Sequence, residues 1–203
     1  MISAEDIKSV EENSGISKLT LMENAGRGVY GVIKEKFPEL KGKRILVVCH
    51  HGNNGGDGFV VARYLADESE TDILFVGDEG KFKEEAKTNF KRIEKNERIQ
   101  LLVDYEAIDF NDYDVIIDAI LGIGILGELK EPIKSVIGLV NSSTAFKIAV
   151  DVPTGLNPDT GEVAEEMVNA DIIATFHDVK KGLSKLKDKV VVVDIGIPKE
   201  EAK

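Results

Sequence analysis

The sequence is poor in the residues that cross-link a fold or anchor it in a membrane. Its 203 residues include a single cysteine, Cys49, and no tryptophan. One cysteine excludes an internal disulfide and favours a reducing compartment, so we expect a cytoplasmic protein. No apolar run approaches the ~18 residues that are needed to span a bilayer, and we expect no membrane contact. The first residues, Met1–Asp6, are polar and acidic, which argues against a secretory signal.

Basic residues are also outnumbered. The chain has 26 lysines and arginines against 37 aspartates and glutamates, which gives a formal net charge of −11. Because nucleic-acid binding depends on positive charge that neutralises phosphates, we expect no nucleic-acid partner. The hydrophobic fraction of 42% is typical of a globular protein. At ~100–200 residues per domain, the length predicts a single domain over residues 1–203.

The N-terminal part of the chain has the pattern of two helices. Ser3 can cap a short helix that ends near Ser14. A second helix is predicted from Lys18 to Phe37, because apolar residues recur there every three or four positions. Pro38 then ends it, since proline cannot continue a helix.

Short apolar runs then alternate with polar, helix-like segments. Such runs are typical of strands covered on both faces, and the alternation predicts a parallel sheet. Right-handed crossovers give a three-layer, doubly wound α/β fold of the Rossmann-like kind. The predicted fold is therefore two helices in residues 1–40 followed by a mainly parallel α/β core in residues 42–198, with the strand order left open. The predicted strands are Arg44–Cys49, Asp72–Val76, Ile99–Val103, Val115–Ile117, Lys147–Val150, Ile172–Phe176 and Val190–Val193.

A glycine-rich segment, Gly52–Gly58, follows the first predicted strand. Ligands of an open parallel sheet bind beyond the carboxyl ends of its strands. We expect a loop here, ahead of a helix that begins near Asp57. Its glycines would let the backbone approach a ligand, and the helix N-terminus would offer N–H groups to an anion. The alternative is a flexible turn between strand and helix.

A second segment, residues 118–127, contains the pattern G-x-G-x-x-G at Gly122–Gly127. The same pattern occurs at Gly26–Gly31, where the surrounding period is helical and the glycines favour close helix packing. The match at Gly122–Gly127 follows a strand, which is the context of a nucleotide-binding loop. Asp118, at the end of that strand, can either ligate a cation or cap a turn.

The third segment is Asp151–Gly155. Pro153 fixes the backbone and Gly155 permits a positive φ, so Asp151 is held firmly at the edge of the sheet. A carboxylate in that place can act as a general acid or base. The alternative is a turn residue that only caps the backbone. We expect all three segments to line one pocket.

Two other groups of residues are weaker candidates for a functional site. Cys49, His50 and His51 are adjacent at a strand end, where neighbouring side chains point to opposite faces and converge badly on one metal ion. Lys180 and Lys181 could reach a phosphate, although solvated lysines are the commoner outcome.

Five segments, taken in order, are similar to those of one family. They are Leu21–Gly26, Gly52–Gly58 with Ala62 and Arg63, Asp118–Gly127, Asp151–Gly155 and Asp194–Pro198. Over essentially its whole length the chain resembles the NAD(P)H-hydrate epimerases, the YjeF N-terminal domain family, and the Asn-Asn-Gly-Gly-Asp-Gly element is specific to it. His51 stands where the family often has glycine, and Thr154 where serine is common; we expect only local effects.

This resemblance implies a repair reaction on nicotinamide cofactors. Members of the family interconvert the R and S epimers at C6 of hydrated NADH and NADPH. In bifunctional members a dehydratase domain follows, so this chain is expected to work with a separate NAD(P)H-hydrate dehydratase. The resemblance also implies a homodimer, with the two N-terminal helices as our expectation for the subunit contact.

The resemblance implies specific site residues as well. A potassium ion is expected on Asn54, Asp118 and Thr154, whose amide, carboxylate and hydroxyl oxygens suit a hard cation. Asp151 is the expected catalytic acid or base. The residues implied in binding the damaged dinucleotide are Asn53, Asn54, Gly55, Gly56, Asp57, Gly122, Ile123, Gly124, Ile125, Leu126, Gly127, Glu128 and Asp151.

Two other functions, a dehydrogenase and a non-catalytic binding module, agree less well with the sequence. An NAD(P) dehydrogenase would use Gly122–Gly127 with Asp151, 24 residues further on, as the acid that binds ribose. Against it, the glycine pattern follows the fourth predicted strand rather than the first, and no apparatus for hydride transfer is visible. A non-catalytic module that binds RNA or protein would have altered site loops, whereas this chain keeps the site residues of the family.

Overall fold

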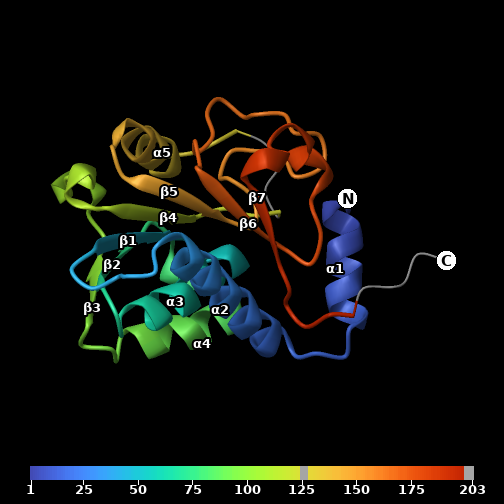
Figure 1. The fold of residues 1–203 in the computed structure, drawn as a ribbon, viewed down its shortest axis with the longest axis horizontal. Helices are drawn as coiled ribbons and strands as arrows, with labels where there is room; N and C mark the ends of the chain where they lie inside the picture. The colour runs from blue at the N-terminus through green and yellow to red at the C-terminus, as the bar shows by residue number, and fades with distance from the viewer. Residues whose placement is uncertain (124–127, 199–203) are drawn as a thin grey trace.

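Seven parallel strands form one sheet in the computed structural model, which describes residues 1–123 and 128–198 (Figure 1). Their order across the sheet is β3-β2-β1-β4-β5-β6-β7. The predicted α/β class is confirmed, and the sheet is parallel throughout. The strands are β1 (Arg44–Cys49), β2 (Glu70–Phe75), β3 (Ile99–Leu102), β4 (Val115–Ala119), β5 (Phe146–Val150), β6 (Ile172–Phe176) and β7 (Val190–Val193).

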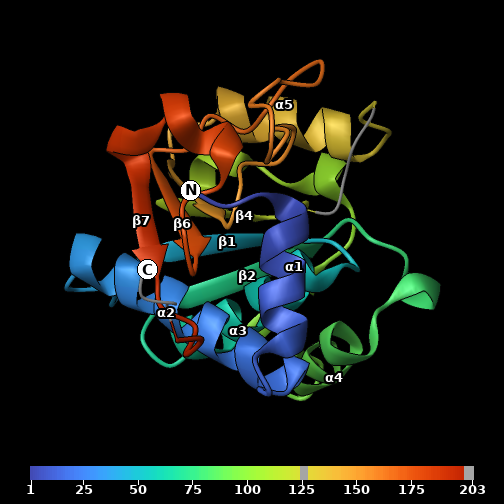
Figure 2. The ribbon, with the colours of Figure 1, turned by 90° about the vertical axis from the view of Figure 1, so that its right-hand side faces the viewer.

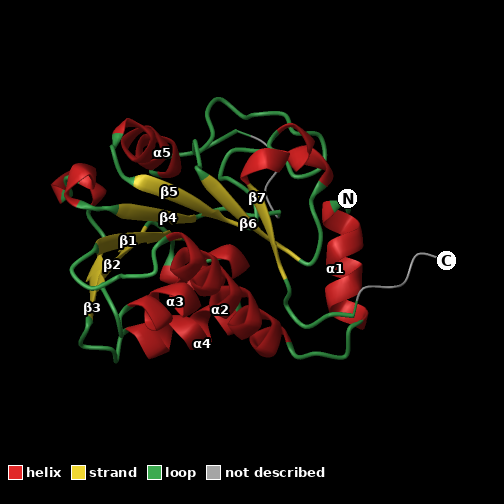
Figure 3. Cartoon of the chain, viewed as in Figure 1, coloured by secondary structure: helices red, strands yellow, loops and turns green. Residues whose placement is uncertain are grey.

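Helices cover both faces of this sheet, which explains why its central strands are apolar on both sides. Val47 of β1 belongs to the core that includes Phe59, whereas Val48 belongs to the opposite core with Val136. In the described part of the chain, no helix combines the length and the apolarity needed to cross a membrane. The helices α2 (Lys18–Lys36), α3 (Asn53–Leu65) and α4 (Glu84–Ile93) lie on one face and α5 (Ile133–Ser142) lies on the other (Figures 1 and 3).

The first helix, α1 (Ala4–Asn13), stands apart from these layers, across the edge where the strands end (Figure 2). Ser3 caps it as predicted, because its side chain accepts a hydrogen bond from the N–H of Asp6. The second helix, α2, packs closely on α3. A Cβ on Gly26 would lie 2.5 Å from Cβ of Val60, so the prediction that this glycine serves helix packing is confirmed.

The structure corrects the predicted end of the fourth strand. β4 continues to Ala119, two residues beyond the predicted end at Ile117. Asp118 is paired within the sheet, opposite Val48 of β1 on one side and Ala149 of β5 on the other. Its backbone is therefore as rigid as the sheet itself.

The glycine-rich segment is a helix rather than a loop, so that prediction is wrong. Helix α3 begins at Asn53, with Gly52 as its N-cap. The glycines inside it let the helix lie against β1: a Cβ on Gly55 would come within 1.7 Å of the carbonyl oxygen of His50, and one on Gly58 within 2.7 Å of Sγ of Cys49. The N–H groups of the first turn still point out of the helix, where an anion can accept their hydrogen bonds.

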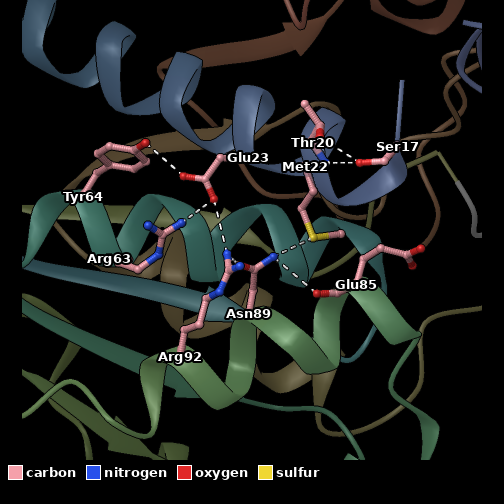
Figure 4. Close-up of polar contacts among 9 residues, drawn as sticks. All are labelled: Ser17, Thr20, Met22, Glu23, Arg63, Tyr64, Glu85, Asn89 and Arg92. Atoms are coloured by element: carbon pink, nitrogen blue, oxygen red, sulfur yellow. Dashed lines mark hydrogen bonds and ion pairs between the residues drawn. The ribbon is translucent and has the colours of Figure 1, made fainter. Parts of the chain in front are cut away.

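A polar cluster joins α2 to α3 and α4 (Figure 4). The carboxylate of Glu23 accepts hydrogen bonds from Arg63 at 2.5 Å and from the hydroxyl of Tyr64 at 2.9 Å, and it lies 3.6 Å from Arg92. These side chains are partly exposed, which weakens each ion pair. Met22, next to Glu23, lines a cavity described below, so the cluster holds one wall of that cavity in place.

We expect Glu23→Gln to lower the free energy of unfolding by about 1 kcal/mol, because it removes the charge that two arginines share. Urea denaturation followed by circular dichroism measures this loss. Glu35→Gln is the matched control, since Glu35 is an exposed residue of the same helix. Equal stability of the two variants would show that the cluster contributes nothing to holding the helices together.

Candidate active site

The three predicted segments meet at one edge of the sheet, but among the described residues they line two cavities rather than the single pocket that we expected. The strands β1 and β4 are neighbours from which the chain winds in opposite directions, and a ligand crevice opens beyond the carboxyl ends of such a pair. Asn53 starts the helix after β1, Asp118 lies near the end of β4, and Asp151 follows β5, the next strand.

Asp118 is buried, and the loop after β5 holds its carboxylate. Its Oδ1 accepts a hydrogen bond from Oγ1 of Thr154 at 2.6 Å, and its Oδ2 accepts one from the N–H of Thr154 at 2.8 Å. The N–H of Ile120 also reaches Oδ1, at 3.2 Å, so Asp118 does cap a turn. Thr154 is anchored further, because its Oγ1 accepts from the N–H of Leu121 at 3.0 Å.

Asn54 comes to the same place from helix α3. Its side-chain oxygen lies 3.2 Å from the point that a Cβ on Gly122 would occupy, so glycine leaves room for this side chain. Asn54 is only 8% exposed, and its Nδ2 atom has no hydrogen-bond partner among the described residues. Buried polar atoms without a partner are rare in native proteins, and a bound substrate with an acceptor atom would pair with this N–H donor.

These three residues fit a hard cation such as potassium. Asn54, Asp118 and Thr154 offer amide, carboxylate and hydroxyl oxygens. Burial raises the pKa of Asp118 to about 6, although its hydrogen bonds from Thr154 and Ile120 act in the opposite direction. None of the ion pairs among the described residues includes Asp118, so its buried charge is not offset by a side chain. A bound cation would offset that charge.

Asp151 is fixed in an unusual backbone conformation, with a φ of 65°. Non-glycine residues seldom adopt this left-handed region, and those that do often lie at functional sites. Its Oδ1 accepts hydrogen bonds from Nζ of Lys180 at 2.5 Å, from Oγ1 of Thr175 at 3.2 Å and from the N–H of Phe176 at 3.2 Å. No described residue donates to its Oδ2, which leaves one oxygen available to a ligand.

Lys180 is fully buried, so the expectation that it is solvated is wrong. Its Nζ donates to Asp151 and also to the carbonyl oxygen of Phe176, at 2.8 Å. A backbone bridge between Lys180 and Ile2 holds this segment in place. Nothing in the local sequence distinguishes the buried Lys180 from the next residue, Lys181, which is also a lysine but is exposed.

A cavity of about 180 Å³ opens between α1, the start of α3 and the end of β6. We call it the helix-side cavity. Burial raises the pKa of Asp57 in its wall well above the ordinary value, and the carboxylates of Asp151 and Glu11 raise it further. Burial also raises the pKa of Glu11, another residue that lines this cavity. The residues that line the cavity include Glu11, Met22, Asn53, Asp57, Phe176 and Ile195.

A second cavity, of about 220 Å³, lies between the loops that follow β4 and β5. We call it the loop-side cavity. Gly122 lines it, and a Cβ on Gly122 would lie 3.2 Å from Oδ1 of Asn54, whose neighbour Asn53 lines the helix-side cavity. The residues that line it include Leu121, Gly122, Leu129, Pro153, Gly155 and Glu162.

The loop that carries the glycine pattern is described only at its ends. Ile123 is half-buried and Glu128 is exposed. The predicted binding residues Gly124, Ile125, Leu126 and Gly127 lie outside the described residues. The pattern follows β4, whereas a dehydrogenase carries it after its first strand.

Cys49 and its two histidine neighbours show no arrangement suited to catalysis. Burial raises the pKa of the Cys49 thiol well above its ordinary value, which makes it a poor nucleophile. Burial lowers the pKa of His50 to about 4, and its ring packs against that of His51 at 3.7 Å. Within residues 1–123 and 128–198, no group of three or more histidine, cysteine, aspartate or glutamate side chains could hold a metal ion.

With this geometry in view, the chain can be compared with known proteins. Residues 18–182 match the family model described as YjeF-related protein N-terminus. The chain belongs to this family. Among proteins with a YjeF N-terminal domain, it is 40% identical to the NAD(P)H-hydrate epimerase of Cenarchaeum symbiosum, with 100% of this chain and 98% of that protein covered. It is 39% identical to the protein of the same name from Nitrosopumilus maritimus, with 96% and 93% covered.

Other relatives of the YjeF N-terminal domain are longer or more distant. The chain is 40% identical to the bifunctional NAD(P)H-hydrate repair enzyme Nnr of Archaeoglobus fulgidus, where it spans 42% of that protein's length. The crystal structure of the yeast protein ynu0 superposes with a TM-score of 0.83 at 22% identity, with 95% of this chain and 86% of that chain covered. That yeast structure has the same fold.

Proposed function

We propose that this chain is an NAD(P)H-hydrate epimerase, an isomerase that interconverts the R and S epimers at C6 of hydrated NADH and NADPH. The observation that carries this proposal is about 40% identity with two proteins of that name over nearly their whole length. Two cavities at the edge of the sheet where its strands end suit a long substrate such as a dinucleotide. The first turn of α3 offers N–H groups to its phosphates.

The proposed epimerisation requires few functional groups from the protein. C6 of the damaged ring carries a hydroxyl and the ring nitrogen, so it is a hemiaminal. The nitrogen lone pair can expel the hydroxyl, and water can return from the other face of the ring. The chain must hold the ring and move protons, which contributes roughly 10²–10⁴-fold to the rate. Asp151, fixed in place with Oδ2 available, is the acid or base that we propose for this transfer.

Potassium is the proposed cofactor, held by Asn54, Asp118 and Thr154. When bound, the ion would supply a positive charge that offsets the buried carboxylate of Asp118. The buried carboxylate of Asp118, which forms no ion pair with a described residue, supports this assignment.

We expect the rate of the wild-type protein to rise with potassium chloride more than with tetramethylammonium chloride at equal ionic strength. Asp118→Ala should remove this difference and weaken substrate binding, because it deletes the anionic ligand of the site. Initial rates over a salt series, with both proteins, measure the effect. A wild-type rate that is the same in both salts would contradict the assignment of a potassium site.

The partners proposed here follow from the bifunctional relatives. In those proteins one chain is named for both repair steps, so we propose that this chain supplies epimer to a separate NAD(P)H-hydrate dehydratase in the cytoplasm. We also propose a homodimer through the N-terminal helices, which sedimentation velocity tests directly.

The decisive test of the function follows one purified C6 epimer of hydrated NADH by chiral chromatography. With the protein present, we expect rapid conversion to the equilibrium mixture of epimers. Intact NADH should be unchanged in the same assay. A rate equal to the spontaneous rate, with folded protein at potassium saturation, would exclude the proposed activity.

A further inference from the structure

Two carboxylates near the helix-side cavity differ in whether a cation compensates their charge. Asp57 lines this cavity, and Asp151 accepts a hydrogen bond from the N–H of Phe176, which also lines it. Asp151 accepts the ammonium of Lys180 at 2.5 Å, and both side chains are buried, with 0% of Lys180 and 8% of Asp151 exposed. Asp57 forms no ion pair with any residue that the structure describes, and no described residue donates a hydrogen bond to its carboxyl group. One group thus has a fixed counter-charge and the other has none.

The buried position of Lys180 restricts its ammonium group to partners inside the protein. Its ammonium donates to Oδ1 of Asp151 and to the carbonyl oxygen of Phe176, which is the last residue of β6. With no exposed surface, the ammonium cannot reach a phosphate in solvent. Its charge therefore acts on the substrate only through Asp151.

Asp57 has the opposite surroundings. It lies in the wall of the helix-side cavity, in a helix that packs against α2 and β1. Burial raises its pKa well above the ordinary value, and the negative charges of Asp151 and Glu11 add to this, while Lys180 acts weakly the other way. A carboxyl group in such a place retains its proton at a pH where an exposed aspartate has lost it.

We propose that Asp57 and Asp151 are the opposed proton donor and proton acceptor of this site, and that Lys180 is the positioning residue that gives Asp151 the accepting role. The inference rests on the proposed epimerase function and deepens it. Active sites commonly divide acid and base roles between two carboxyl groups whose environments differ in this way.

The proposed steps balance in atoms and charge. Asp57 gives its proton to the C6 hydroxyl as the carbon–oxygen bond breaks; water leaves and the ring nitrogen lone pair forms a carbon–nitrogen double bond. A water molecule then attacks C6 from the other face, its oxygen forms the new bond, and Asp151 accepts its released proton. The electrons of the double bond return to nitrogen. A proton passes through solvent from Asp151 to Asp57 and resets the site.

The first test is Asp57→Asn, which keeps the size and polarity of the side chain but cannot give up a proton. We expect kcat to fall by about 10²-fold with little change in KM. The wild-type rate should decline at alkaline pH as Asp57 loses its proton, and this decline should be absent from the variant. The other charged side chains that line the cavity, and that remain in both proteins, are Lys8, Glu11, Glu12, Lys18, Lys83 and Glu85.

The second test is Lys180→Met, with Lys181→Met as the matched control at the neighbouring exposed position. The variant removes the positive charge that lies 2.5 Å from Oδ1 of Asp151, and a neighbouring positive charge favours the ionised form of a carboxyl group, so the decline of rate at acid pH should move to higher pH. Lys181→Met should leave the profile unchanged. A purely structural role of Lys180 would lower the amount of active protein without moving the profile.

A third variant covers the case in which Lys180→Met does not fold. Combining it with Asp151→Asn removes both charges of the buried pair, which avoids an uncompensated ammonium. We expect this double variant to be no slower than Asp151→Asn alone, because Lys180 acts through Asp151. A further loss of kcat in the double variant would overturn the positioning role.

The outcomes separate the two proposals. A folded wild-type protein without epimerase activity overturns the proposed function and this inference together. An active wild-type protein whose Asp57→Asn variant keeps the same kcat and the same alkaline decline overturns the inference alone.

Discussion

Asp151→Asn should lower kcat by about 10²–10⁴-fold, which is the contribution of a well-placed proton acceptor. The amide has the shape of the carboxylate and still accepts the hydrogen bonds of Thr175 and Phe176, but it cannot take a proton from water. Because the ammonium of Lys180 loses its buried counter-charge, we also expect a lower Tm. The chiral assay with one epimer of hydrated NADH gives the rate, and thermal unfolding gives the Tm.

The control for this variant is Asp188→Asn, which makes the same chemical change at an exposed position. Its rate and its Tm should match those of the wild-type protein. If folded Asp151→Asn protein epimerises as fast as the control, then Asp151 is not the group that moves the proton.

Gly55→Ala should destabilise the fold by about 3 kcal/mol or more, which is at the high end for an overpacked site. The added methyl group would lie 1.7 Å from the carbonyl oxygen of His50, a backbone atom that cannot rotate away. Helix α3 would have to move off β1, and Asn54 and Asp57 would move with it. We therefore expect a loss of activity that exceeds the fraction of unfolded protein, and urea denaturation together with the epimer assay measures both.

Gly31→Ala is the matched control, because Gly31 also lies within a helix but has no atom within 4 Å of its added Cβ. Alanine favours helix over glycine by roughly 0.5–1 kcal/mol, so this variant should be slightly more stable than the wild-type protein. If Gly55→Ala behaves like Gly31→Ala, close packing of α3 on β1 is not the reason for the glycine.

The class of fold could be predicted from the sequence because the signal is local. Runs such as Arg44–Cys49 and Ile172–Phe176 are apolar at all but one position each, and both match the observed strands residue for residue. The order of the strands depends on which runs pair over long distances, and no local pattern contains that information. The start of α3 was misplaced because glycines usually disfavour a helix, whereas here their lack of side chains is what lets the helix lie against the strand.

The site could be predicted in part for the same reason. Asp118 lies near the end of a strand, and Asp151 and the Asn-Asn-Gly-Gly-Asp-Gly element each follow one. Parallel strands bring such segments to one edge. The pair of Asp151 and Lys180 could not be found in this way, because it joins residues 29 positions apart and because the backbone of Lys180 is held by a bridge to Ile2, at the other end of the chain. The role of each of these residues remains a prediction for the experiments above.

Hydrogen bonds of Thr154 join two walls of the loop-side cavity. Thr154 is tied to Asp118 at two atoms and to the backbone of Leu121, so the walls that follow β4 and β5 form one unit. Those walls cannot separate to admit a bulkier ligand without breaking buried hydrogen bonds. Changes in the size of molecule that this cavity accepts must therefore come from the side chains that line it rather than from movement of its walls. The exposed side chains of Glu162 and Val163 are where substitutions aimed at altered selectivity should be placed.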